Sequence, residues 1–120
     1  MTDDFSETSR AQQPIELGTV TMISARDGDV HTICLRGELD LATAGGVQRE
    51  LERVEDTDAK AIVLDLSGLT FMDSTGLRLV MSAHARSRAD ANRLRLMRGS
   101  RAVQRVFELT GVEQMLPFAD

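Results

Sequence analysis

The side chains best suited to chemistry are the hydroxyls of Asp73-Ser74-Thr75-Gly76, which stand between an apolar run and a segment of helical periodicity. The run, residues 61–66, is typical of a buried parallel strand, so the hydroxyls fall where a strand leads into a helix. The first N–H groups of a helix lack partners within it, and the helix dipole favours negative charge there. A phosphate on Ser74 would therefore be accommodated by its own chain.

The four residues alone leave a second interpretation open, in which they do nothing but begin the helix. Asp73 or Ser74 can cap the first turn with a side-chain oxygen. Gly76 has no side chain and would let another chain approach the backbone. Phe71 and Met72 would supply either a staple onto the helix or exposed contact surface. The motif by itself does not choose between a cap and a modified site.

Other signatures of catalysis are missing from the sequence. It contains no G-x-x-x-x-G-K-[ST] phosphate loop and no G-x-S-x-G nucleophile elbow. His31 and His84 have no cysteine or second histidine at metal-ligand spacing. Asp73-Ser74-Thr75-Gly76 resembles an aspartic-protease signature only superficially, because its spacing is off by one residue and its surroundings are helical. We therefore expect no catalytic residue, metal or cofactor, and a protein that is not an enzyme.

Composition and charge narrow the class of protein further. The chain has 120 residues, 42% hydrophobic and 28% charged, which suits one globular domain. No apolar run approaches the roughly 20 residues of a membrane span, and the acidic N-terminus is no secretory signal, so we expect a cytoplasmic protein without a membrane partner. Nine of the 14 basic residues lie after residue 58. Because Trp and Tyr are absent for base stacking, we interpret them as a solvated face and expect no nucleic acid.

The elements that position Ser74 follow from periodicity. Residues 1–13 are polar and aperiodic and predict a mobile tail, whereas 14–120 predict a single domain. Residues 17–23 alternate as one strand and 30–39 as another, and Asp27-Gly28 supplies the hairpin turn between them.

Helices and strands alternate in the rest of the chain. Asp40 caps a helix whose apolar stripe runs from Leu41 to Val54. The further predicted elements are a strand over 61–66, a loop over 67–73, a helix over 74–89, a strand over 93–97, a helix from 100 to 111 and an edge strand over 115–118. Strand–helix–strand units require parallel pairing. We predict an α/β fold, in which helices cover a mixed, mostly parallel sheet with an antiparallel N-terminal hairpin.

Two sequence pieces in this order and separation resemble a known family. They are Gly37-Glu38-Leu39-Asp40 and Phe71-Met72-Asp73-Ser74-Thr75-Gly76-Leu77, and the helix over 103–112 adds to the match. Together they closely resemble the STAS domain family, and within it the bacterial anti-sigma factor antagonists. The resemblance covers about residues 15–118.

The resemblance implies a partner switch. Members bind an anti-sigma factor that is itself an ATP-dependent serine kinase, and this binding frees the sigma factor. The kinase then phosphorylates the motif serine and ends the association, and a metal-dependent serine phosphatase restores it. By position that serine is Ser74, with Thr75 as the second-ranked hydroxyl. The residues expected to bind the partner are Glu38, Asp40, Phe71, Met72, Asp73, Ser74, Thr75, Gly76 and Arg78.

The chain departs from the family pattern in two places. Arg78 stands where relatives often have glycine, and its charge would meet an acid on the partner, the new phosphate, or only solvent. The sequence ends soon after Phe118, so we expect the final helix common in the family to be missing or very short. Loss of that cover would expose apolar surface and favour a weak homodimer.

Two other functions remain open. A STAS subunit could serve a lipid or anion transport complex through a separate membrane partner, and co-purification with a permease would indicate it. A small enzyme or nucleotide binder could use the helix N-terminus as a phosphate cradle, which titration with ATP or GTP alone would test.

Overall fold

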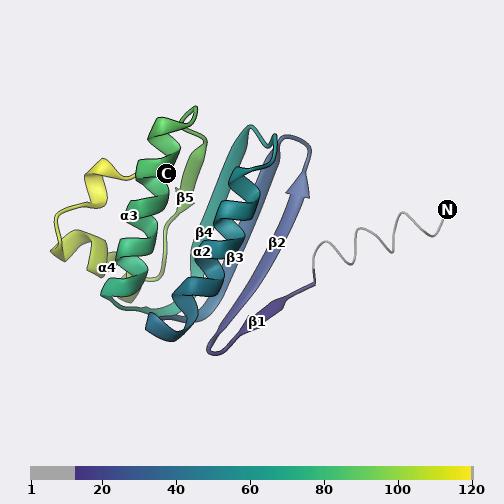
Figure 1. The fold of residues 1–120 in the computed structure, drawn as a ribbon. Coiled ribbons are helices and arrows are strands. Elements are labelled where there is room, and N and C mark those ends of the chain that lie inside the picture. Colours follow the sequence, from purple (N-terminus) through teal and green to yellow (C-terminus); the bar gives the residue numbers. More distant parts are fainter. Residues whose placement is uncertain (1–12, 120) are drawn as a thin grey trace.

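A computed structural model describes residues 13–119, which form a five-stranded sheet and three α-helices (Figure 1). The strands are β1 (Ile15–Leu17), β2 (Val20–Asp27), β3 (Val30–Leu39), β4 (Ala61–Met72) and β5 (Leu94–Met97). The helices are α2 (Leu41–Glu55), α3 (Ser74–Ala89) and α4 (Arg101–Leu109), followed by the 3-10 turn η1 (Glu113–Met115). The strands lie in sequence order across the sheet.

The sheet is mixed, as predicted. β1, β2 and β3 pair antiparallel, and β2 and β3 are joined by a hairpin whose Gly28 has a φ of +62°. β3, β4 and β5 pair parallel, with α2 and α3 as the two crossover helices. When parallel strands are joined through helices, the carboxyl ends of the strands lie together at one end of the sheet. The starts of α2 and α3 therefore lie side by side at that end.

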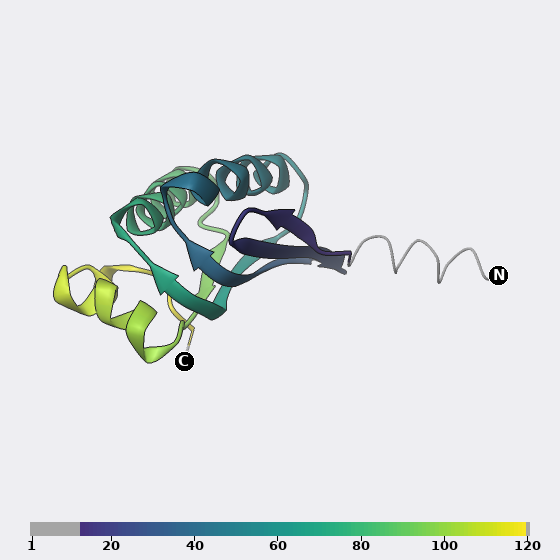
Figure 2. The same cartoon turned by 90° about the horizontal axis from the view of Figure 1, so that it is seen from below.

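Helices α2 and α3 cover one face of the sheet (Figure 2), and the burial pattern follows this arrangement. In β3, buried Ile33 and Leu35 alternate with half-buried Cys34 and exposed Arg36. This is the alternation of a strand with only one face in the core. Helix α4 and η1 lie on the β5 side, where fully buried Phe107 packs edge-on against Phe118 with ring centroids 5.2 Å apart.

The predicted strand over 17–23 is wrong in one respect, because the structure divides it. Leu17 ends β1, Gly18 adopts a φ of +62°, and β2 begins at Val20. The turn lets β1 fold back antiparallel onto β2, with Leu17 opposite Val20. The turn is difficult to predict because apolar and polar residues alternate without a break across it, and Gly18 is the only residue there that indicates a turn.

The predicted loop over 67–73 is also wrong, because β4 continues to Met72 and only Asp73 lies between β4 and α3. The register between β3 and β4 shifts twice, between Cys34 and Arg36 and between Gly37 and Glu38. Each shift inserts an extra residue into β4, so polar residues enter the strand without breaking its pairing. Leu69 and Met72 remain buried in this extension.

The C-terminal segment differs from the predicted edge strand over 115–118. η1 occupies Glu113–Met115, and one parallel bridge joins Phe118 to Leu96. Leu109 and Met115 are 74% and 56% exposed there, and weak self-association through this surface stays a prediction. The predicted tail over 1–13 lies, apart from Gln13, outside the described residues. Within residues 13–119, no helix has the length and apolarity needed to cross a membrane.

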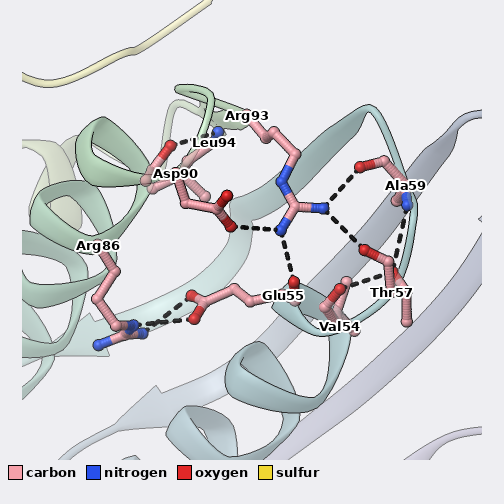
Figure 3. A network of polar contacts seen from close by, with 9 residues as sticks. Val54, Glu55, Thr57, Ala59, Arg86, Asp90, Arg93 and Leu94 are labelled. Atoms are coloured by element: carbon pink, nitrogen blue, oxygen red, sulfur yellow. Dashed lines mark hydrogen bonds and ion pairs between the residues drawn. The ribbon is translucent and has the colours of Figure 1, made fainter.

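A polar network connects α2 to α3 and to the start of β5, at the end of the sheet opposite the starts of α2 and α3 (Figure 3). Arg93 donates to the backbone carbonyls of Glu55, Thr57 and Ala59 and to the carboxylate of Asp90. Arg86 forms a two-pronged ion pair with the Glu55 side chain, at 2.9 and 3.1 Å. Arg93 therefore satisfies carbonyls at the end of α2 that would otherwise lack partners. This network holds in place the two helices that carry Ser74 and its neighbours.

Candidate functional site

Ser74 is the first residue of α3 and its side chain is exposed. Asp73, not Ser74, caps the helix. The Asp73 Oδ1 accepts hydrogen bonds from the backbone N–H groups of Thr75 and Gly76, at 2.9 and 3.3 Å. The Ser74 hydroxyl makes no hydrogen bond to any other residue in the described part of the chain. The first turn is thus complete without it, and the hydroxyl is left available for chemistry.

The end of β3 lies directly beside the end of β4. Glu38 pairs in register with Phe71 and Leu39 with Met72, and the Asp73 N–H donates to the Leu39 carbonyl at 3.3 Å. The juxtaposition of the two motifs at one end of the sheet, expected from the sequence, is therefore present. It results from parallel pairing and not from the chain's local propensities.

Asp40 has the same part in α2 that Asp73 has in α3. Its carboxylate accepts from the N–H groups of Ala42 and Thr43, and the Thr43 hydroxyl accepts from the Asp40 N–H at 3.0 Å. This reciprocal arrangement is a capping box. Exposed Glu38 and half-buried Asp40 therefore place two carboxylates next to the start of α3.

Two large apolar side chains lie open at this edge. Phe71 is 48% exposed, as the contact-surface interpretation requires. Leu41 is 78% exposed, although its spacing from Ala44 and Val47 predicted a core position. Leu41 is the first residue of α2 and is not among its buried residues, because helical spacing alone does not determine what covers the first turn. Single exposed apolar residues are common on protein surfaces, so a role of these two in partner binding stays a prediction.

Met72 and Gly76 face inward, contrary to the expected contact surface. Met72 is 3% exposed, and a Cβ on Gly76 would lie 2.4 Å from the Met72 Cγ and 3.1 Å from a Leu39 methyl. The absence of a side chain at Gly76 therefore lets α3 approach its own core, and neither residue offers a side chain to a second protein. Thr75 is half-buried and Arg78 is exposed.

Thr75 and Arg78 also line a groove between α2 and α3, with a volume of about 410 Å³. We refer to it as the α2–α3 groove. Arg49 and Glu52 border it from the α2 side. The groove leads away from the end of the sheet where Ser74 lies, so it extends the candidate surface along both helices.

A model of the STAS domain family matches residues 22–120. The chain belongs to the STAS domain family. It is 33% identical over 94 residues to the anti-sigma-B factor antagonist of Listeria monocytogenes, which aligns 78% of this chain with 82% of that protein. The resemblance found in the two sequence pieces is thereby confirmed, as is the α/β fold.

Solved structures share the architecture. The anti-sigma factor antagonist SpoIIAA in its unphosphorylated form has a TM-score of 0.70 at 25% identity, over 82% of this chain and 88% of that one. Bacillus SpoIIAA in the phosphorylated form has a TM-score of 0.64 at 24% identity, over 82% and 91% of the two chains. The same fold therefore accompanies both states of that protein.

This STAS domain also contains a polar cluster that the sequence did not reveal, toward the opposite end of β3. The Ser24 hydroxyl donates a hydrogen bond to the Glu50 carboxylate at 2.6 Å. The same oxygen lies 2.7 Å from the Nε2 of His31, and His31 is only 6% exposed. Because the only Ser24 proton is given to Glu50, Nε2 is the donor to Ser24. Arg53 completes the cluster through its ion pair with Glu50. The members come from two strands and a helix, so no local pattern connects them.

This cluster predicts acid sensitivity. Burial, with Arg53 and Arg26, outweighs the carboxylate of Glu50 and lowers the pKa of His31. The unfolded chain then takes up a proton near pH 6.5 that the folded chain takes up only at lower pH. Stability is therefore full above about pH 6.5 and falls as the pH drops, with a slope from this residue of at most about 1.4 kcal/mol per pH unit. The hydrogen bond from Arg53 lowers the pKa of Glu50, which adds a further loss in more acidic solution.

The measurement is the urea midpoint of unfolding between pH 8 and 5, for the wild type and for His31→Gln. The amide of glutamine can still donate to Ser24 but cannot be protonated in this range. The variant should show a flatter dependence between about pH 6.5 and 5. Equal slopes for the two proteins would contradict the assignment to His31.

Proposed function

We propose that this protein is an anti-sigma factor antagonist that acts by partner switching. With Ser74 unmodified it binds an anti-sigma factor serine kinase in the cytoplasm, and the sigma factor held by that kinase is released. Phosphorylation of Ser74 ends the association, and a serine phosphatase restores it. In this scheme the protein is a substrate and a binding partner rather than an enzyme.

The observation that carries the proposal is the free and exposed hydroxyl of Ser74 on a helix turn already capped by Asp73. A kinase active site can reach this oxygen without unfolding any element. In the transfer, the Ser74 Oγ forms a bond to the γ-phosphorus of ATP, the bond from that phosphorus to the bridging oxygen breaks, ADP leaves, and a base of the kinase takes the hydroxyl proton. Thr75 is half-buried whereas Ser74 is exposed, which favours Ser74 as the acceptor.

The partner surface that we propose surrounds this oxygen. It consists of Leu41 and Phe71 as apolar anchors, with polar groups of Glu38, Asp40, Asp73, Thr75 and Arg78 around them. A few large apolar side chains inside a polar rim are the usual basis of affinity in such contacts. The names of the relatives support the class of partner, since the Listeria protein is an anti-sigma-B factor antagonist.

The decisive experiment isolates the chain with its bound proteins, identifies an ATP-binding kinase among them, and incubates the purified pair with labelled ATP. Wild-type protein should incorporate phosphate at Ser74, as mapped by mass spectrometry. Ser74→Ala should bind the kinase and incorporate none, whereas Ser82→Ala, which removes an exposed hydroxyl farther along α3, should incorporate it in full. Full incorporation into Ser74→Ala would move the acceptor elsewhere.

A further inference from the structure

We propose that Arg78 binds the phosphate of phosphorylated Ser74 within the same chain. The inference rests on the proposed function, because it takes Ser74 as the residue that carries the phosphate. It adds a group that recognises the modified state, where the proposed function needs only that the phosphate exclude the partner.

The spacing of the two residues brings their side chains together. Arg78 follows Ser74 by four positions in α3, and side chains four apart on a helix are neighbours on one face. Both side chains are exposed, so the arginine can reorient without breaking the core. Among residues 13–119, Arg78 has no ion pair and no hydrogen bond to another residue, in contrast to Arg86 and Arg93 of the network at the opposite end of the sheet. Its guanidinium is thus available for a new anion.

The surrounding charges make this arginine the group on which a phosphate would depend. Asp73 precedes Ser74 directly, and Glu38 and Asp40 lie at the same edge of the sheet, so the local field is acidic. Phosphorylation adds about −1.5 to −2 charges at pH 7. Besides the N-terminus of α3, which favours negative charge, the phosphate would otherwise face three carboxylates at this end of the sheet.

The α2–α3 groove contributes a second positive charge near Arg78. Arg49 borders the groove opposite Arg78, and its Nη1 lies 3.6 Å from where a Cβ on Gly45 would be. The arginine therefore extends back over Gly45, toward the amino end of α2. Glu52 is the one acid in the lining of the groove, and the two arginines outnumber it.

The chemistry of the two groups fits this pairing. A guanidinium presents parallel N–H donors that match two phosphate oxygens, and such charge-assisted pairs are among the stronger hydrogen bonds. Because the dianion is the better acceptor, Arg78 favours the second deprotonation of the phosphate. The pairing therefore lowers the second pKa of phosphoserine 74, which is ordinarily about 6.

The test is a ³¹P NMR titration of full-length protein with phosphoserine placed at residue 74 during synthesis, so that no kinase is needed. Arg78→Gln should raise the second pKa of the phosphate by about 0.3–0.7 units relative to the unsubstituted phosphoprotein. The difference should shrink in 1 M salt, where exposed charges are screened. Arg88→Gln, an exposed arginine at the other end of α3, should leave the pKa unchanged.

Equal titration curves for the Arg78→Gln and unsubstituted phosphoproteins would overturn the inference. So would a result in which Arg78→Gln leaves the pKa alone and weakens binding of the unphosphorylated protein to the kinase, since Arg78 would then contact an acid on the partner. Neither outcome touches the proposed function. If instead the purified kinase fails to phosphorylate Ser74, the proposed function is wrong. The titration can still be interpreted, because its phosphoserine is placed at residue 74 during synthesis.

Discussion

Phosphorylation of Ser74 should weaken binding to the kinase by at least about a hundredfold, which corresponds to about 3 kcal/mol. The loss arises in the complex. A contact surface fitted to a neutral hydroxyl must admit a dianion, and a charge without a partner in a desolvated interface is costly. Isothermal titration of the kinase with the unmodified and phosphorylated proteins measures the difference.

The antagonist itself should keep its fold in both states. The phosphate would lie at the N-terminus of α3, where negative charge is stabilising by about 0.3–1 kcal/mol, so the melting temperature should not fall. Ser74→Asp, with a single charge and a shorter side chain, should weaken binding in the same direction by about tenfold. Ala85→Asp serves as the control, since Ala85 is exposed on the same helix, about three turns from its start and outside the α2–α3 groove. Unchanged affinity for Ser74→Asp and for the phosphoprotein would exclude a charge mechanism.

The position of Ser74 could be predicted because several local signals agree. An apolar strand, an aspartate with capping chemistry and a helical period meet at one point in the sequence, and the structure places Asp73 as the cap and Ser74 as the first helical residue. The neighbouring loop could be predicted for a different reason. Parallel pairing of β3 and β4 requires Glu38 and Phe71 to end up at the same edge.

The orientation of individual side chains at the site could not be read from the sequence. Met72 and Phe71 are adjacent in β4, and only the register with β3 decides that Met72 turns inward while Phe71 turns outward. The two register shifts in β4 depend on contacts with β3 that lie more than 30 positions away in the chain. The cluster of Ser24, His31 and Glu50 was missed for the same reason, because its partners are distant in sequence.

Replacing Gly37 with alanine should destabilise the protein by about 3 kcal/mol, more than a substitution at any glycine outside the Asp73-Ser74-Thr75-Gly76 motif. Gly37 has a φ of +98°, and a Cβ there would lie 2.1 Å from the backbone carbonyl oxygen of Thr19. That oxygen cannot move aside, since it also accepts from the Glu38 N–H at 3.0 Å. The clash therefore acts on two strands at once and displaces either the turn before β2 or the end of β3.

Gly28→Ala is the matched control because Gly28 shares the positive φ, at +62°, but a Cβ added there would have no neighbouring atom within 4 Å. It should cost only the backbone strain, about 1 kcal/mol. Urea unfolding of the two variants measures how much free energy of unfolding each loses, and so separates backbone strain from the clash with Thr19. An equal loss in both variants would show that Thr19 does not approach Gly37 so closely. A displaced β3 end would also carry Glu38 and Asp40 away from Ser74. Gly37→Ala should then weaken kinase binding while Gly28→Ala does not, which would connect the glycine of Gly37-Glu38-Leu39-Asp40 to the shape of the contact surface.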